Sequence, residues 1–69
     1  MVEVFKTNVT EEWAAASILQ QLQNKIPEAK INFDLEYCDH ILRVESAVVA
    51  TKPITELVQQ NGFDCEVLA

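Results

Sequence analysis

The fold is decided by residues 2–14, which read VEVFKTNVTEEWA. Residues Val2 to Lys6 are rich in β-branched and aromatic side chains and predict a strand. After a short loop, Thr10 is placed to cap a helix, because its hydroxyl can accept a hydrogen bond from a first-turn N–H. Glu11 and Glu12 then stand at the positive end of the helix dipole. The chain therefore opens with a strand, a loop and a helix.

The predicted helix carries one apolar stripe, whose members recur at the spacing i, i+3, i+4, i+7 and i+11. These residues are Ala15, Ile18, Leu19, Leu22 and Ile26. Pro27 lacks the N–H that the next helical hydrogen bond needs, and we expect it to end the helix.

Two further strands are expected in the middle of the chain. Residues 31–36 alternate between apolar and polar side chains, which indicates a strand with one wet face. Residues 37–40 are typical of a tight connection. Residues 41–45 predict the returning strand, with Leu42 and Val44 pointing inward.

The last third of the chain predicts a second helix and a fourth strand. Pro53 stands near the helix start, where a missing N–H matters least. The inner stripe of this helix is Ile54, Leu57 and Val58. Gly62 is a natural C-terminal cap because it tolerates positive φ, and residues 63–67 alternate as a strand. Residues 46–51 either extend the third strand or form a loop.

The order of elements is β-α-β-β-α-β, which predicts an α+β ferredoxin-like fold. Right-handed crossovers bring the two halves together as one antiparallel sheet with both helices on one face. The expected strand order is 4-1-3-2, with strands two and four at the edges. Residues 1–69 are expected to form a single domain, near the small end of what folds unaided.

The chain resembles the heavy-metal-associated domain family over nearly its whole length. That family carries Gly-Met-Thr-Cys-x-x-Cys between its first strand and helix, and Asn8, Val9 and Thr10 stand at the first three positions. Glu11 and Ala14 stand at the two cysteine positions. The remaining matches are Leu57 and Val58 in the second helix and Gly62-Phe63 before the last strand.

The resemblance implies a carrier that binds Cu(I) or another soft metal through two thiolates and passes it between chaperones and transporters. Soft ions prefer thiolate ligands. Glu11 offers a hard carboxylate oxygen and Ala14 offers no ligand, so we expect no copper trafficking by the family mechanism and no cofactor.

A replacement metal site has candidates in Glu11, Glu12, Cys38 and His40. The spacing Cys38-x-His40 in a hairpin could hold two corners of a zinc site, with Asp39 between them. The alternative interpretation is that the hairpin carries Asp and His for turn geometry and solubility. Cys65 alternates with apolar residues and is expected to be a small buried side chain. A full tetrahedral set is missing, so no bound metal ion is expected.

Trp13 is a candidate for partner binding, because it lies off the apolar stripe in the first turn of the helix. A large aromatic on a polar helix face can anchor a partner. Alternatively, its ring folds over a neighbouring loop and shields the helix start.

The open face of the sheet is a second candidate surface. If Val4, Phe33, Val44 and Val67 point to the helices, the alternate positions form a face of carboxylates around Phe5, with Ile41 and Arg43 nearby. The expected outward set is Glu3, Phe5, Asn32, Asp34, Glu36, Ile41, Arg43, Glu45, Asp64 and Glu66. Such a face can dock a basic protein surface or self-associate, or it can simply be solvated.

The charge balance narrows the possible partners. Eleven acidic residues against five basic ones give a net charge of −6, which disfavours nucleic acid and anionic membranes. No apolar run approaches the roughly 18 residues that span a bilayer. A strand that starts at Val2 leaves no room for a leader, so the expected compartment is the cytoplasm, where the two cysteines are expected to be free thiols.

No nucleophile–base pair and no glycine-rich phosphate loop are found, so the chain is not expected to be an enzyme. The leading hypothesis is a small non-catalytic interaction module on a heavy-metal-associated frame without the cysteine pair. The alternative hypothesis is metal-ion binding or trafficking through Glu11, Glu12, Cys38 and His40.

Overall fold

The computed structural model describes residues 1–34 and 40–68, and it has the predicted order of elements. The strands and helices are β1 (Val2–Thr7), α1 (Glu12–Lys25), β2 (Lys30–Asp34), β3 (Ile41–Glu45), α2 (Thr51–Gln60) and β4 (Cys65–Leu68). The predicted connection at residues 37–40 is described only at His40, so Cys38, Asp39 and the expected outward residue Glu36 lie outside the described part. Neither described helix is long and apolar enough to cross a membrane.

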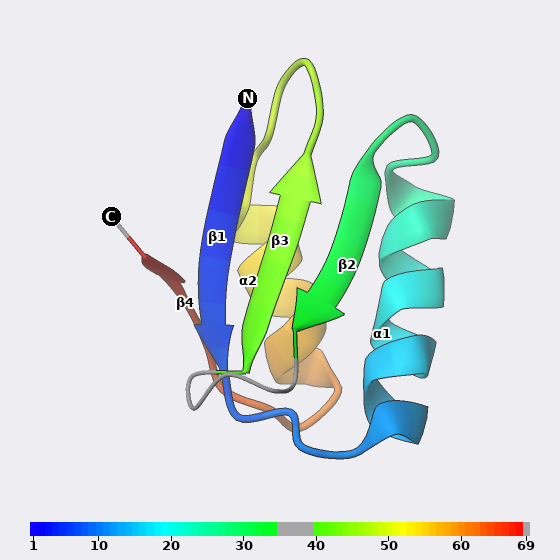
Figure 1. Ribbon diagram of the computed structural model, residues 1–69, viewed down its shortest axis with the longest axis vertical. Coiled ribbons are helices and arrows are strands. Elements are labelled where there is room, and N and C mark those ends of the chain that lie inside the picture. The colour runs from blue at the N-terminus through cyan, green and yellow to red at the C-terminus, as the bar shows by residue number, and fades with distance from the viewer. Residues whose placement is uncertain (35–39, 69) are drawn as a thin grey trace.

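The four strands form one antiparallel sheet in the order β2-β3-β1-β4, which confirms the predicted 4-1-3-2 arrangement. Figure 1 shows α2 behind the middle of the sheet and α1 along the outer side of β2. The helices α1 and α2 pack on opposite edge strands, α1 on β2 and α2 on β4, and they also touch each other. Each edge strand is therefore in contact with a helix, and the two helices lie on the same face of the sheet.

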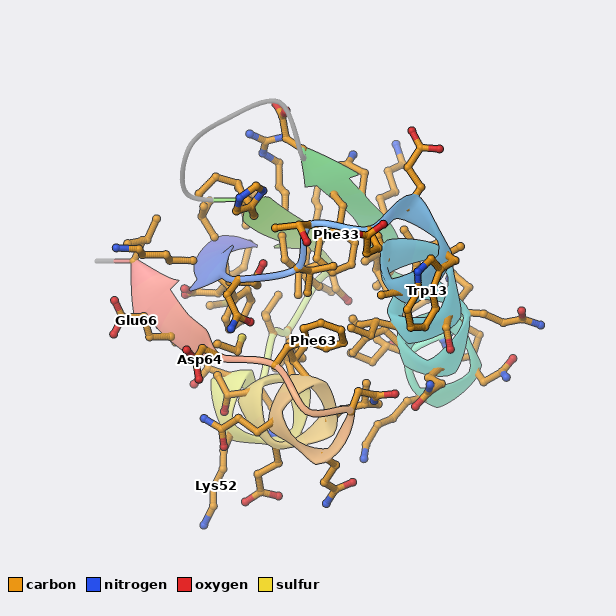
Figure 2. The ribbon with its side chains drawn as sticks, turned by 90° about the horizontal axis from the view of Figure 1, so that it is seen from below. Trp13, Phe33, Lys52, Phe63, Asp64 and Glu66 are labelled. Atoms are coloured by element: carbon orange, nitrogen blue, oxygen red, sulfur yellow. The ribbon has the colours of Figure 1, made fainter. Side chains whose placement is uncertain are left out.

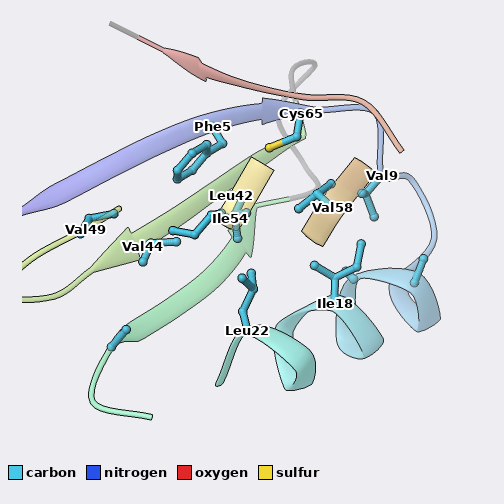
Figure 3. Packing of buried hydrophobic residues seen from close by; sticks show 13 residues of the cluster. Phe5, Val9, Ile18, Leu22, Leu42, Val44, Val49, Ile54, Val58 and Cys65 are labelled. Carbon is cyan, nitrogen blue, oxygen red and sulfur yellow. The ribbon is translucent and has the colours of Figure 1, made fainter. Parts of the chain in front are cut away.

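The core lies between the sheet and the two helices, as Figure 3 shows. It combines side chains from every layer, because each element carries one apolar face. Its largest fully buried members are Phe5, Val9, Ile18, Leu22, Leu42, Val44, Ile54 and Val58. The predicted stripes of both helices are confirmed, with Leu19 and Leu57 at their half-buried margins.

The prediction for the faces of β1 was wrong. Phe5 is fully buried, and the register sets it opposite Leu42, so both point to the helices. Glu3 shares that face at the far end of the strand, whereas Val4 stands opposite Arg43 on the open face. Because side chains alternate along a strand, a one-residue error exchanges the two faces completely. Phe5 is therefore not a surface residue for a partner.

The other strands follow the prediction more closely. The register places Asn32, Asp34, Ile41, Arg43, Glu45 and Glu66 on the open face, as expected. Phe33 and Val67 are on the helix side, although Val67 is 40% exposed because it belongs to an edge strand. Asp64 lies before β4 rather than on the sheet face.

The start of α1 differs from the prediction. Its N-cap is Glu11, which has extended backbone angles and makes no side-chain capping bond, so Thr10 is not the cap. The loop is instead held by Thr7, whose Oγ1 accepts a hydrogen bond from the N–H of Val9 at 3.2 Å. With Thr7 and Val9 both buried, tertiary packing sets where the helix begins. The predicted end is confirmed, because α1 stops at Lys25, before Pro27.

Residues 46–50 form a loop rather than an extension of β3. Met1 holds this loop through two hydrogen bonds with Ser46: its ammonium group donates to the carbonyl oxygen at 2.7 Å, and its own carbonyl accepts from the N–H at 3.0 Å. Met1 is thereby tied to the start of this loop, directly after β3. Val49, a residue of this loop, is buried in the core.

Candidate functional site

Three connections meet at one end of the sheet, which Figure 2 shows from below. They are the β1–α1 loop, the approach to β3 at His40, and the α2–β4 turn; together they are the loop end of the sheet. Thr7 Oγ1 donates to the carbonyl of His40 at 2.6 Å. Asn8 Oδ1 accepts from the N–H of Asp64 at 2.7 Å, and Asn8 Nδ2 donates back to the Asp64 carboxylate at 3.3 Å. These hydrogen bonds hold the three connections together at the loop end of the sheet.

Glu11 and Ala14, which the family resemblance sets at the two cysteine positions, have opposite environments. Glu11 is exposed, whereas Ala14 is 2% exposed and belongs to the core. A buried methyl group cannot coordinate an ion, and a single carboxylate is a hard ligand. The residues at the start of α1 therefore do not fit a two-thiolate site for a soft metal.

The other metal candidates are not gathered into a site by the described residues. Glu12 is exposed in the first turn of α1. His40 has a left-handed backbone with φ of 46°, and its buried Nδ1 has no hydrogen-bond partner within the described part of the chain. No three His, Cys, Asp or Glu side chains among the residues that the structure describes lie close enough to hold a metal ion.

Cys65 is a buried free thiol on the helix face of β4. Burial raises its pKa from 9.0 to about 11, and the negative charge of Glu66 adds to the rise. Because the thiolate is the metal ligand and the nucleophile, a thiol that keeps its proton at neutral pH is poorly suited to either role. The prediction of a small buried side chain is confirmed.

Trp13 lies in the first turn of α1 and is 72% exposed. Figure 2, seen from below, shows its ring in front of the first turn of the helix. With 72% of its surface exposed, the ring buries little against a neighbouring loop. Trp13 remains the large aromatic side chain that the loop end presents to solvent.

The open sheet face contains the candidates Ile41 and Arg43, but its centre is Val4 rather than Phe5. Arg43 is exposed and donates from Nη1 to Asn32 Oδ1 at 3.4 Å. Leu68 stands opposite Val4 from the other side and is 37% exposed. With Lys6 and Arg43 among the carboxylates, this face is mixed in charge, and the predicted acidic surface around Phe5 was wrong.

Val4 and Leu68 are thus surface residues that the sequence analysis missed. A signal was available, because Leu42 and Val44 were correctly assigned inward. Strand β1 must present an apolar side chain opposite the inward Leu42. Phe5 offers more apolar area to bury there than Val4 does.

Two solved structures share this architecture. The solution structure of the yeast copper transporter domain Ccc2a, determined in apo and Cu(I)-loaded states, matches with a TM-score of 0.83 at 23% identity, covering 99% of this chain and 94% of that one. The chain has the fold of a heavy-metal-associated domain. The N-terminal domain of PacS from Synechocystis PCC6803 matches with a TM-score of 0.63 at 17% identity, covering 100% and 98% of the two chains.

No protein-family model and no curated protein matches the sequence. The likeness to the two solved structures is therefore one of backbone fold, at 23% and 17% sequence identity.

Proposed function

We propose that this chain is a small non-catalytic interaction module on a heavy-metal-associated frame, and that it contacts a protein partner through Trp13 at the loop end of the sheet. The observation that carries the proposal is the 72% exposure of Trp13, one residue before a buried alanine that cannot serve as a ligand. Tryptophan is enriched among the residues that dominate binding energy at protein interfaces.

The surroundings of Trp13 favour a basic partner. Glu11 and Glu12 directly precede it in the sequence, and both are exposed. An indole face attracts the cations of Arg and Lys, and nearby carboxylates add to that attraction and steer a basic surface towards the site. The net charge of −6 acts in the same direction.

Partner capture with matched variants tests this proposal. Val48 is 75% exposed in the 46–50 loop, so Val48→Ala controls for the loss of an exposed apolar side chain. We expect wild type and V48A to capture the same partner, and W13A to bind it at least about tenfold more weakly, because interface hot spots are worth roughly 2 kcal/mol or more. Circular dichroism checks that W13A remains folded. Equal binding by W13A and wild type contradicts the proposal.

The second candidate function is metal-ion binding or trafficking through Glu11, Glu12, Cys38 and His40. It is favoured by the likeness to a domain solved with Cu(I) and by the unpaired Nδ1 of His40 within the described residues. Calorimetric titration with Zn²⁺, Ni²⁺ and, under reducing conditions, Cu(I) separates the two candidates. Micromolar binding that His40→Ala and Glu11→Gln abolish supports the metal site, and the absence of heat removes it.

A further inference from the structure

We propose that a second copy of this chain docks along β2, so that the two four-stranded sheets join edge to edge around a two-fold axis. This surface lies on the outer side of β2 and α1. It does not include Trp13, and the proposal is independent of the partner contact proposed there.

The first observation is the free side of β2. Among the described strands, β2 has a neighbour on one side only, namely β3. An edge strand presents a row of backbone N–H and C=O groups that can pair with another strand. Beside that edge lies a groove of about 460 Å³ between β2 and α1, lined in part by Ala15, Ala16, Leu19 and Phe33. The side of this edge that faces α1 is therefore hollowed.

The second observation is that the sequence of β2 is complementary to itself. It reads KINFD from Lys30 to Asp34, which is basic, apolar, polar, apolar and acidic in order. Antiparallel pairing of two copies centred on Asn32 sets each Lys30 opposite Asp34 of the second copy. Opposite charges directly across an antiparallel pair attract, and like charges repel. The charge pattern therefore selects this register.

The faces of the strand agree with the same register. Lys30, Asn32 and Asp34 lie on the open face, while Ile31 and Phe33 point to the helices. Both apolar side chains are half-buried at this edge. In the paired arrangement Ile31 stands opposite Phe33 of the second copy, so each covers the exposed part of the other, and no side chain changes face.

The helix beside the groove permits the approach. Figure 1 shows α1 running along the outer side of β2, so docking also brings α1 towards its counterpart. On the α1 side the groove is lined by Ala15, Ala16 and Leu19, together with the acidic Glu12 at the helix start. Small side chains let two helices pack at the short end of the usual 8–10 Å interaxial range.

We favour a second copy over an unrelated segment because an antiparallel copy of β2 matches the charge order from Lys30 to Asp34. A two-fold interface uses the same patch on both partners, so every favourable pair occurs twice. The interface draws on only one strand and one helix face. We therefore expect a dimer that dissociates when the protein is diluted.

Sedimentation velocity across a dilution series of the whole chain tests the proposal through a charge swap. Lys30→Asp and Asp34→Lys each turn two attractions into two repulsions, and each is expected to weaken dimerisation at least about tenfold. The double variant K30D/D34K restores opposite charges and is expected to dimerise like wild type. Glu66→Lys, on the other edge strand and exposed, is the matched control and is expected to change nothing.

Cross-linking tests the register directly. In a Cys38→Ser background, Asn32→Cys sets two cysteines opposite each other on the axis, with Cα atoms about 4.5–5.5 Å apart, which is within disulfide range. We expect oxidation to yield a covalent dimer. Arg43→Cys, exposed on the open face of the neighbouring strand β3, is expected to give none.

A wild-type chain that stays monomeric at the highest protein concentration of the dilution series overturns the proposal. Single reversals that dimerise like wild type overturn it as well, as does a double variant that fails to recover while remaining folded. If the monomer binds a synthetic extended peptide in the groove instead, the edge takes a different occupant and the second copy is excluded.

Discussion

Phe5 is the residue whose position most changes the interpretation of the surface. It is fully buried between the sheet and the helices, and it stands opposite Leu42 and Val67 on its two neighbouring strands. A substitution here therefore acts through folding and not through partner binding. The contribution of Phe5 to stability can be measured separately from any interaction.

Replacing Phe5 with Ala is expected to lower the free energy of unfolding by about 3–5 kcal/mol, because the lost apolar area is compounded by a cavity. That is a large share of the stability of a small domain. Val2→Ala on the same strand is the control, since Val2 is 51% exposed, and its effect should stay within about 0.5 kcal/mol. Urea unfolding followed by circular dichroism measures both. An unchanged midpoint for F5A contradicts the placement of Phe5.

The raised pKa of the Cys65 thiol is expected to make the free energy of unfolding depend on pH in the alkaline range. Its folded-state pKa of about 11 lies above the ordinary 9.0, so the folded chain holds the thiol proton more tightly than the unfolded chain does. The resulting stabilisation is fully present below about pH 9 and is lost as the pH rises towards about 11. Urea midpoints across that window should fall more steeply for wild type than for Cys65→Ala. Parallel curves for the two proteins would show that the thiol makes no contribution.

At the scale of single elements, the end of α2 shows how one glycine shapes a junction. Gly62 has φ of 91°. Its N–H donates to the carbonyl of Gln59 at 2.9 Å, and the N–H of Phe63 donates to that of Val58 at 3.3 Å. This pair of bonds is the Schellman motif, which satisfies carbonyls that the helix end leaves free. The motif also directs the chain from α2 into the turn before β4, where the N–H of Asp64 donates a hydrogen bond to Asn8 Oδ1.

Replacing Gly62 with Ala is expected to destabilise the protein by about 1–2 kcal/mol, the cost of left-handed backbone for a residue with a Cβ. A Cβ at this position would meet nothing within 4 Å, so the loss comes from the backbone alone. Gly62→Asn should cost less, because Asn tolerates this conformation better. Thermal unfolding ranks the three proteins. A G62A variant more stable than G62N would contradict the backbone explanation.

At the scale of the whole molecule, the dominant property is the excess of acidic charge. A net charge of −6 is confined to a body whose principal extents are 28 × 24 × 19 Å. At low salt the Debye length is about 30 Å, comparable to the molecule, and it falls below about 10 Å at physiological ionic strength. Repulsion between the carboxylates therefore opposes the compact state most strongly at low salt.

Raising the NaCl concentration from about 10 to about 200 mM is expected to raise the thermal midpoint by a few degrees, since about 1 kcal/mol corresponds to roughly 4–8 °C for a domain of this size. Circular dichroism at low protein concentration measures this on the monomer. Exposed Glu56 on α2 supplies the comparison, because Glu56→Lys lowers the excess charge and should reduce the response to salt. An equal or larger response in E56K would argue against charge repulsion.

Tertiary structure supplied what local patterns could not. The face of β1 depends on which of two adjacent apolar residues, Val4 or Phe5, meets Leu42 across the sheet. The start of α1 depends on Thr7, which is buried and holds the loop through Val9, rather than on the hydroxyl of Thr10. The groove beside β2 exists only once α1 has packed along that edge, so no periodicity in the sequence predicts it.

The sequence by itself determined the order of the elements, the inner stripes of both helices, the end of α1 before Pro27 and the turn at Gly62. Each of these rests on residues a few positions apart, where backbone chemistry and helical spacing act directly. The structure alone decided which face each residue of β1 occupies and that Ala14 is buried in the core. Those outcomes depend on partners distant in the chain, because burial is a property of the packed layers and not of one segment.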